Sequence, residues 1–196
     1  MSVTPVRPNQ RERILDAALR LMSEHGSAKT SMRQLARDCG LNVAALYHYF
    51  ESKDALLAAV IDERQYGARL AEVPEIPADI SPAERLELIY RTVWEGALAE
   101  EPIWRLLLGE GLRREAAVLP VGRGLLDVIR PGLTAWIEVA IPEVVAPPSS
   151  VADLIFGQLF AGFVRHIFDP DLDVGIIERE SAAALIAALF APSALR

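Results

Sequence analysis

The chain has 196 residues, of which 52% are hydrophobic and only 7% aromatic. A core built mainly from Leu, Ala, Ile and Val favours helices over sheets, and the excess of apolar residues leaves surface for oligomerisation or a ligand cavity. The net charge of −7 argues against nucleic acid as a partner of the chain as a whole. However, residues 1–50 hold seven Lys or Arg against four Asp or Glu, whereas the remainder holds thirteen against twenty-three. Only the N-terminal end therefore suits a phosphate backbone.

Several classes of protein are disfavoured at once. Cys39 is the single cysteine, so the chain has no internal disulfide and no cluster of thiolate metal ligands. Residues 1–8 lack the apolar run of a signal peptide. The most hydrophobic stretch, 151–168, contains Asp153 and Arg165, so a buried helix explains it better than a membrane span. We therefore expect a cytoplasmic protein without a cofactor, a metal or a membrane partner.

Four helices are predicted in the N-terminal part of the chain. Apolar residues at helical spacing form the first helix, which ends at Gly26. Further helices are predicted over residues 31–39, 42–50 and 53–71. Gly40 lies in the turn between the second and third helices, where a positive φ is needed.

Proline-rich segments divide the rest of the chain. Residues 72–80 are predicted to be a linker, because two prolines and several acidic residues stop the preceding helix. The run Ser81-Pro82-Ala83-Glu84 is typical of a capping box with proline at the first helical position. A second linker is predicted at 146–150, followed by helices over 151–168 and 175–190. Between the linkers, three prolines are each expected to break or kink a helix: Pro102, Pro120 and Pro131. The prediction is an all-α fold of about nine helices.

The stretch from residue 30 to residue 57 carries the functional signal. Its pattern predicts two short helices that cross at a steep angle. Four apolar residues recur at the spacing that seals both helices over one small core: Leu35, Cys39, Leu41 and Leu46. Ala36 is small, as a close approach of the second helix requires. The second helix then has an exposed face that is free to enter the major groove of DNA.

Here the chain resembles the tetracycline-repressor-type (TetR) family of regulators. The resemblance covers about residues 10–57, a quarter of the chain. The matching residues are Arg13-Ile14-Leu15-Asp16-Ala17-Ala18, His25-Gly26, Thr30, Leu35, Ala36, Gly40, Leu41, Leu46-Tyr47-His48-Tyr49-Phe50, Ser52-Lys53 and Leu56. It implies an N-terminal three-helix DNA-binding domain over residues 1–55. A larger helical domain for effector binding and dimerisation would occupy residues 56–196.

Geometry and resemblance together predict the DNA-binding residues, which are Thr30, Ser31, Arg33, Asn42, Val43, Ala44, Ala45, Tyr47, His48 and Lys53. Residues 42–45 begin the recognition helix and would face base edges, and Tyr47, His48 and Lys53 would reach phosphates. Thr30 and Ser31 would cap the preceding helix. His48 could instead be an ordinary solvated residue.

Three further expectations concern side chains in and beside this motif. Ala44 replaces a frequent Gly or Pro, and this departure leaves the operator sequence open. Tyr49 and Phe50 are expected to face inward. Cys39 is expected to be a small buried hydrophobe rather than a redox switch.

Aromatic residues of the larger domain suggest an effector pocket. The candidates are Tyr90, Trp94, Trp104, Phe156, Phe160, Phe163 and His166, with Arg105, Gln158 and Arg165 as further polar anchors. Aromatic residues at helical spacing are also what an ordinary core would contain, so both interpretations stay open. The resemblance implies a homodimer through the last two helices.

The leading hypothesis is a repressor that a hydrophobic or aromatic molecule releases from a palindromic operator. The alternative is an effector-free dimeric regulator whose larger domain serves only dimerisation or partner binding. An enzyme is disfavoured, because the sequence has no Ser-His-Asp order, metal-ligand cluster or Gly-rich phosphate loop.

Overall fold

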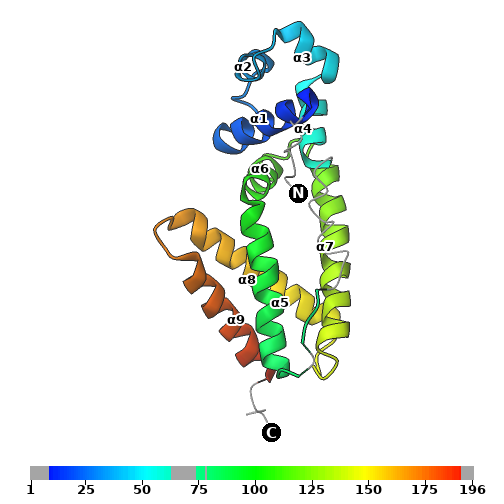
Figure 1. Cartoon of the computed structure of the whole chain (residues 1–196), viewed down its shortest axis with the longest axis vertical. Coiled ribbons are helices and arrows are strands. Elements are labelled where there is room, and N and C mark those ends of the chain that lie inside the picture. The colour runs from blue at the N-terminus through cyan, green and yellow to red at the C-terminus, as the bar shows by residue number, and fades with distance from the viewer. Residues whose placement is uncertain (1–8, 63–73, 78, 191–196) are drawn as a thin grey trace, which may run out of the picture. The chain divides into compact units, whose positions relative to one another are not determined.

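The computed structural model describes residues 9–62, 74–77 and 79–190. Within these ranges every regular element is an α-helix, which confirms the predicted all-α fold. The helices in chain order (Figure 1) are α1 (Gln10–His25), α2 (Met32–Asp38), α3 (Val43–Tyr49), α4 (Lys53–Asp62), α5 (Pro82–Ala99), α6 (Glu101–Leu112), α7 (Leu119–Ala140), α8 (Pro148–Phe168) and α9 (Val174–Phe190).

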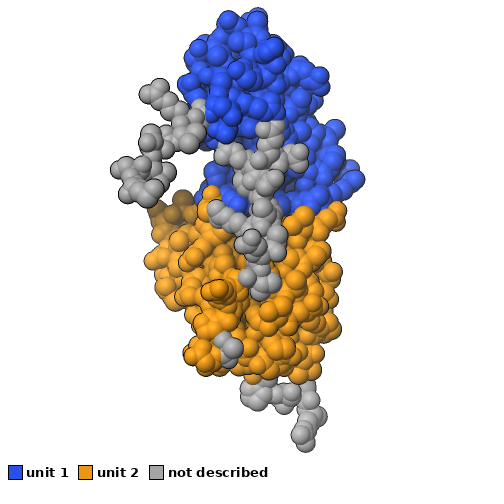
Figure 2. Space-filling view, turned by 45° about the vertical axis from the view of Figure 1, so that its right-hand side comes forward, with its two compact units in different colours: residues 1–66, 100–125 blue, residues 67–99, 126–196 orange. Residues whose placement is uncertain are grey.

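The chain forms two compact units, which Figure 2 shows in different colours. The first contains residues 1–66 and 100–125, and the second contains residues 67–99 and 126–196. Helix α7 begins in the first unit and continues in the second. The predicted domain boundary lies between residues 55 and 56, whereas the compact units group α4 and α6 with the N-terminal helices. The division into a DNA-binding domain over residues 1–55 and a larger domain over residues 56–196 therefore stays a prediction.

The first unit has one apolar core, in which α1 packs against α2, α4 and α6. Ile14 and Ala18 of α1, Leu35 of α2 and Leu46 of α3 are completely buried in it. The apolar spacing of the sequence therefore predicted this core correctly. Trp104 of α6 packs against the same core.

Side-chain caps determine where several helices begin. At α1, the Asn9 side chain accepts from the Glu12 backbone N–H at 2.9 Å, and the Asn9 backbone N–H donates to the Glu12 carboxylate at 2.9 Å. Ser81 and Glu84 form the same reciprocal pair at α5, at 3.3 and 2.8 Å. The predicted capping box at residue 81 is thus confirmed. Such caps stabilise a helix by about 1 kcal/mol each.

In the second unit, α9 packs against both α5 and α8. Gly162 of α8 lies where Trp94 of α5 and Ile177 of α9 converge, so the three helices approach closely at this glycine. Among the described helices, α8 alone is long and apolar enough to cross a membrane. The buried residues of α8, among them Ile155 and Phe163, contribute to this core.

Two of the three prolines begin helices rather than interrupt them. Pro102 lies in the first turn of α6 and Pro120 in the first turn of α7, where a missing N–H costs nothing. Pro131 lies inside α7, so the helix continues through it without a break, and the kink expected as the other outcome stays a prediction. Helix α8 begins at Pro148, three residues before the predicted start.

Parts of two predicted segments lie outside the described residues. These are residues 63–71 of the long fourth helix and residues 72, 73 and 78 of the first linker. Residues 74–77 of that linker have no regular secondary structure, as expected for a linker with two prolines.

Candidate nucleic-acid interface

The turn between α2 and α3 is a Schellman motif, which fixes the direction in which α3 leaves. Gly40 has a φ of +67°, a conformation that favours glycine. Its N–H donates to the Arg37 carbonyl at 3.1 Å, and the Leu41 N–H donates to the Ala36 carbonyl at 2.8 Å. The predicted positive φ at Gly40 is therefore confirmed. Leu41 is half-buried against the core, so the turn is also held by packing.

Helix α3 has one buried face and one exposed face. Leu46 and Phe50 point into the core, one helical turn apart. Ala44, Tyr47 and His48 share the opposite face, and all three are exposed, with Tyr47 at 49%. Tyr47 and His48 make one end of this face polar, where it can contact a phosphate. At the other end the small apolar side chain of Ala44 allows a close approach to base edges.

The N-terminal end of α3 is capped by Asn42. The Asn42 Oδ1 accepts from the Ala45 backbone N–H at 2.7 Å, while the residue itself stays exposed. Val43 and Ala45 are half-buried on either side of exposed Ala44. Of the four residues expected at base edges, Asn42 and Ala44 are therefore the most accessible.

The start of α2 differs from expectation at one residue. Ser31 is the N-cap, and its hydroxyl accepts from the Gln34 N–H at 3.2 Å. Thr30 is 0% exposed, and its hydroxyl donates to the carbonyls of Gly26 and Leu21. Its side chain secures the turn after α1 and is not placed to reach DNA. Arg33 on α2 is exposed.

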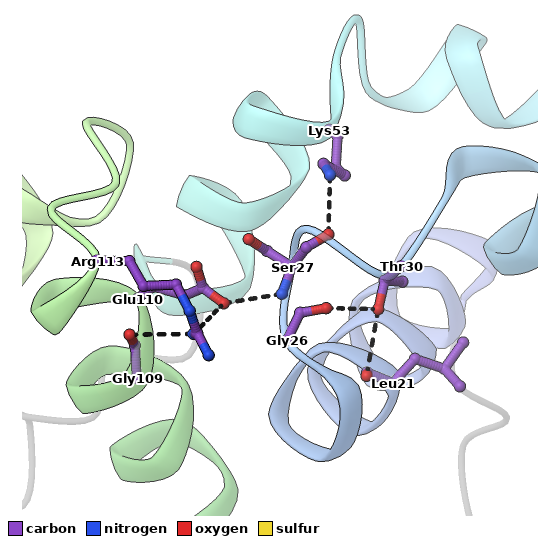
Figure 3. Close-up of polar contacts among 8 residues, drawn as sticks. All are labelled: Leu21, Gly26, Ser27, Thr30, Lys53, Gly109, Glu110 and Arg113. Carbon is purple, nitrogen blue, oxygen red and sulfur yellow. Dashed lines mark hydrogen bonds and ion pairs between the residues drawn. The ribbon is translucent and has the colours of Figure 1, made fainter.

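Lys53 makes a contact that the sequence did not indicate. It is half-buried, and its ammonium donates to the Ser27 carbonyl at 2.8 Å (Figure 3). An ammonium has three N–H donors, so two remain for a phosphate. The Ser27 N–H in turn donates to the buried carboxylate of Glu110 on α6 at 2.8 Å. Glu110 was absent from the predicted site because nothing local to α6 links it to residues 26–53.

Arg11 joins the start of α1 to the end of α3. Its guanidinium lies 4.3 Å above the centre of the Phe50 ring and donates to the Tyr49 carbonyl at 3.3 Å. Phe50 is buried as expected, but Tyr49 is 38% exposed, so the inward orientation predicted for Tyr49 is wrong. Tyr49 follows the exposed pair Tyr47 and His48 around the last turn of α3.

Two basic residues beside the predicted site were also missed. Lys29 and Arg37 are exposed, on the turn after α1 and on α2 respectively. The basic character of the N-terminal fifty residues was the available signal for them. Arg20 pairs with Asp38 at 2.6 Å, so this arginine is partly neutralised.

Cys39 is buried between α1 and α2, which confirms its expected inward position. Burial raises the pKa of its thiol, and the neighbouring Asp38 carboxylate acts in the same direction. A raised pKa lowers the fraction of thiolate, which is the nucleophilic form. The environment of Cys39 thus suits an inert packing residue.

The seven residues predicted for an effector pocket are not all brought together. Tyr90, Trp94 and Phe163 are buried in the second unit. Trp104 belongs to the first unit, and Phe160 on α8 is 50% exposed, so neither of these two lies in the interior of the second unit. The other two candidates, on α8, are half-buried: Phe156 and His166.

The predicted polar anchors lie near helix surfaces. Arg165 is exposed and pairs with Glu180 of α9 at 2.8 Å, and Arg105 is exposed and pairs with Glu101 one turn earlier on α6. Within the second unit, burial raises the pKa of the Tyr90 phenol, while the Ser181 hydroxyl acts in the opposite direction. Tyr90 is therefore a neutral, buried phenol between α5 and α9.

Helices α2 and α3 with the Gly40 turn form a helix-turn-helix, which defines a class of DNA-binding domain. Residues 14–60 match the sequence model of the family described as "Bacterial regulatory proteins, tetR family". Residues 14–60 therefore form a DNA-binding domain of the TetR family, as the resemblance predicted.

Curated relatives match over part of their length. The regulator BetI of Rhizobium meliloti is 31% identical over 113 residues, which are 56% of this chain and 56% of BetI. The regulator UidR of Escherichia coli K12 is 41% identical over 64 residues, 32% of this chain and 33% of UidR. The chain thus covers between a third and three fifths of these relatives. The nucleoid occlusion factor SlmA of Aliivibrio fischeri is 30% identical over 115 residues, 57% of this chain and 58% of SlmA.

Solved structures resemble the chain over nearly all of its length. The reduced form of Escherichia coli NemR has a TM-score of 0.73 at 14% identity and covers 94% of this chain and 100% of NemR. A transcriptional regulator of Aquifex aeolicus has a TM-score of 0.71 at 19% identity, covering 92% and 100%. At these identities the likeness shows the fold alone.

Proposed function

We propose that the protein is a sequence-specific, DNA-binding transcriptional regulator that acts in the cytoplasm. The observation that carries the proposal is the exposed face of α3, where Ala44, Tyr47 and His48 stand opposite the buried Leu46. This face belongs to the basic part of an otherwise acidic chain. A helix of this kind fits the major groove, and the surrounding positive charge favours the phosphate backbone.

In the proposed interface, Asn42, Val43, Ala44 and Ala45 face base edges, and Ala44 suits a thymine methyl group. Tyr47, His48 and Lys53 contact phosphates, together with Ser31 and Arg33 on α2. The Thr30 side chain is left out because it is buried. Exposed Lys29 and Arg37 are added as further phosphate contacts.

The regulator would act as a homodimer through α8 and α9. Both helices present an exposed face of apolar and small residues: Leu154, Gly157, Phe160, Ala161 and Phe168 on α8, and Ile176, Ala183, Ala184, Ala187 and Ala188 on α9. Small residues let helices of two subunits approach closely, and bulky Phe160 and Phe168 supply the apolar area. Two recognition helices one DNA turn apart would bind a palindrome far more specifically than one.

Release of the operator by a hydrophobic small molecule is the finer part of the proposal. It is supported by the aromatic residues inside the second unit, notably Tyr90, Phe163 and Trp136. One observation favours the alternative of an effector-free dimeric regulator, namely that Trp94 packs tightly on Gly162 and so fills part of that interior. An effector that binds the DNA-incompetent state about 100-fold more tightly would shift the equilibrium by about 2.7 kcal/mol.

The test is selection of bound sequences from random duplex DNA at physiological salt. We expect enrichment of a palindrome whose half-sites lie about one helical turn apart. Enrichment of a single half-site would contradict the dimer, and no enrichment at low salt would contradict DNA binding. The selected duplex then serves as the probe in a release screen with hydrophobic molecules, where the lack of any releasing compound favours the effector-free regulator.

A further inference from the structure

The backbone of Ser27 contacts a charged side chain on each side of its Cα atom (Figure 3). Its N–H donates to Glu110 Oε1 at 2.8 Å, and its carbonyl accepts from Lys53 Nζ at 2.8 Å. Ser27 and its contact with Glu110 are buried, so water competes little there, whereas the contact with half-buried Lys53 is partly buried. The three groups form a line from α6, through the turn after α1, to the first residue of α4.

The turn that contains Ser27 is held by hydrogen bonds on both sides. Gly26 has a φ of +83° and ends α1 with its N–H on the Met22 carbonyl. The Thr30 hydroxyl then donates to the Gly26 carbonyl at 3.0 Å and to the Leu21 carbonyl at 3.3 Å. The Ser27 carbonyl therefore has a well-defined position, and so does the Lys53 ammonium that donates to it.

Glu110 is 1% exposed, which is costly for a carboxylate unless it is paired. Its Oε1 accepts hydrogen bonds from Arg113 Nη1, at 3.4 Å, and from the Ser27 N–H. Arg113 is more than half exposed and also donates to the Gly109 carbonyl at 3.1 Å. Arg113 is thus a weak partner, and the short, buried bond to Ser27 is the main contact of the carboxylate.

The two contacts act on neighbouring peptide groups, because the Ser27 N–H belongs to the peptide bond with Gly26 and the Ser27 carbonyl to the peptide bond with Ala28. Both hydrogen bonds are charge-assisted, so each restrains one side of the Ser27 Cα atom. Together they fix the orientation of the Ser27 backbone, although the two side chains belong to different helices.

We propose that Glu110 is a positioning residue for DNA binding: through the Ser27 backbone it holds the Lys53 ammonium where two of its N–H donors reach a DNA phosphate. This inference rests on the proposed DNA-binding function. Loss of the acceptor at residue 110 loosens the Ser27 backbone, and the Lys53 side chain then loses the contact that orders it.

The experiment measures the affinity of the full chain for a random-sequence duplex between about 50 and about 200 mM salt. The variants are Lys53→Met, Glu110→Leu, the double variant and Glu110→Gln, whose amide oxygen can still accept from Ser27. The control is Glu101→Gln on the same helix, which changes the net charge as Glu110→Gln does but leaves the Ser27 contacts intact. Thermal unfolding first verifies that each variant is folded.

Each lost phosphate contact lowers the slope of log affinity against log salt by about 0.9, which is about 3.5-fold in affinity across this salt range. We expect the slope to fall by about 0.9 for each subunit in Lys53→Met and in Glu110→Leu. The double variant should have the same slope as either single variant. Glu110→Gln should keep the wild-type slope. An unchanged slope in folded Glu110→Leu, or additive losses in the double variant, would overturn the proposal.

A second measurement does not depend on whether Glu110→Leu folds. Amide hydrogen exchange at Ser27 is compared between the wild type and Lys53→Met, with Leu21 as the internal reference. A selective loss of protection at Ser27 supports the link, and unchanged protection contradicts it. If the wild type binds no duplex at any salt, the proposed function fails and the role of Lys53 fails with it, whereas the exchange result still reports the Glu110–Ser27–Lys53 link.

Discussion

The indole ring of Trp94 on α5 packs directly against the backbone of Gly162 on α8. A Cβ atom at residue 162 would lie 3.0 Å from Cζ3 of Trp94 and 2.9 Å from Cγ2 of Ile177 on α9. Both neighbours are stiff side chains, and Trp94 is almost completely buried. This contact assigns Trp94 to the packing of three helices rather than to a ligand surface.

Gly162→Ala should therefore destabilise the protein. Overpacking of a core costs about 1–3 kcal/mol, more than the roughly 1 kcal/mol that alanine contributes to a helix interior. Gly96→Ala on α5 is the control, since a Cβ there meets nothing within 4 Å and should raise stability by about 0.5–1 kcal/mol. Urea unfolding measures both variants. Equal stabilisation by the two substitutions would show that Trp94 has room to move and refute the packing argument.

Asn42 offers a way to separate the cap of α3 from its role at DNA. Asn42→Asp should fold normally, because aspartate caps as well as asparagine and suits the helix dipole. It should nevertheless bind every duplex more weakly, because it brings a negative charge into an interface with negatively charged DNA. Asn42→Ser keeps the cap without the charge, so its affinity for random-sequence duplexes should stay close to that of the wild type. Titration with duplex DNA measures these affinities. A wild-type affinity for Asn42→Asp would mean that this end of α3 does not approach DNA.

Phe160 is 50% exposed on the proposed dimer face of α8. Phe160→Asp should give a monomer in dilute solution, because an acidic group buried between two subunits has no partner on this apolar surface. Leu112→Asp is the control, since Leu112 is an exposed apolar residue on α6, outside that face. Sedimentation velocity distinguishes the two variants. A Phe160→Asp dimer as stable as the wild type would place the dimer interface elsewhere.

Arg85 and Glu143 make the stability of the second unit depend on pH. The buried Arg85 guanidinium contacts the Glu143 carboxylate at 2.6 Å and donates to the Ala140 carbonyl at 2.8 Å. Its hydrogen bond holds the pKa of Glu143 below the ordinary value of 4.5. Because the folded pKa is the lower one, the contribution to stability is complete above about pH 4.5 and is lost as the pH falls through the folded pKa.

Glu143→Gln should consequently lower the Tm at pH 7, with a difference from the wild type that shrinks as the pH falls below 4.5. Glu138→Gln, an exposed acid on α7, is the matched control. Thermal unfolding followed by circular dichroism over this pH range provides the comparison. A difference that stays constant with pH would mean that the carboxylate charge of Glu143 does not contribute.

Local signals in the sequence predicted most of the helix-turn-helix. Leu35, Cys39 and Leu46 are buried as their spacing indicated, and Gly40 has the positive φ that its turn requires. Each of these features depends on residues within one or two helical turns, where backbone geometry alone decides which side chains share a face. The same locality explains why the Ser81–Glu84 capping box was predictable.

The sequence was a weaker guide to which of two adjacent residues caps a helix, to which residue at a helix end is buried, and to whether a proline ends a helix. Ser31 rather than Thr30 caps α2, because Thr30 is taken by the carbonyls at the end of α1. Tyr49 is exposed, whereas the next residue, Phe50, takes the buried position at this end of α3. Pro131 lies inside α7, which continues in spite of the lost hydrogen bond.

The sequence by itself determined the all-α class, the helix starts that carry caps, and the apolar and exposed faces of the helix-turn-helix. Only the tertiary structure decided that Trp94 meets Gly162 and that Glu110 meets Ser27, 83 residues away along the chain. Periodicity reports which face of a helix is buried and says nothing about which distant residue covers it. Those pairings depend on how complete helices pack, where a single missing Cβ or one buried carboxylate selects the neighbour.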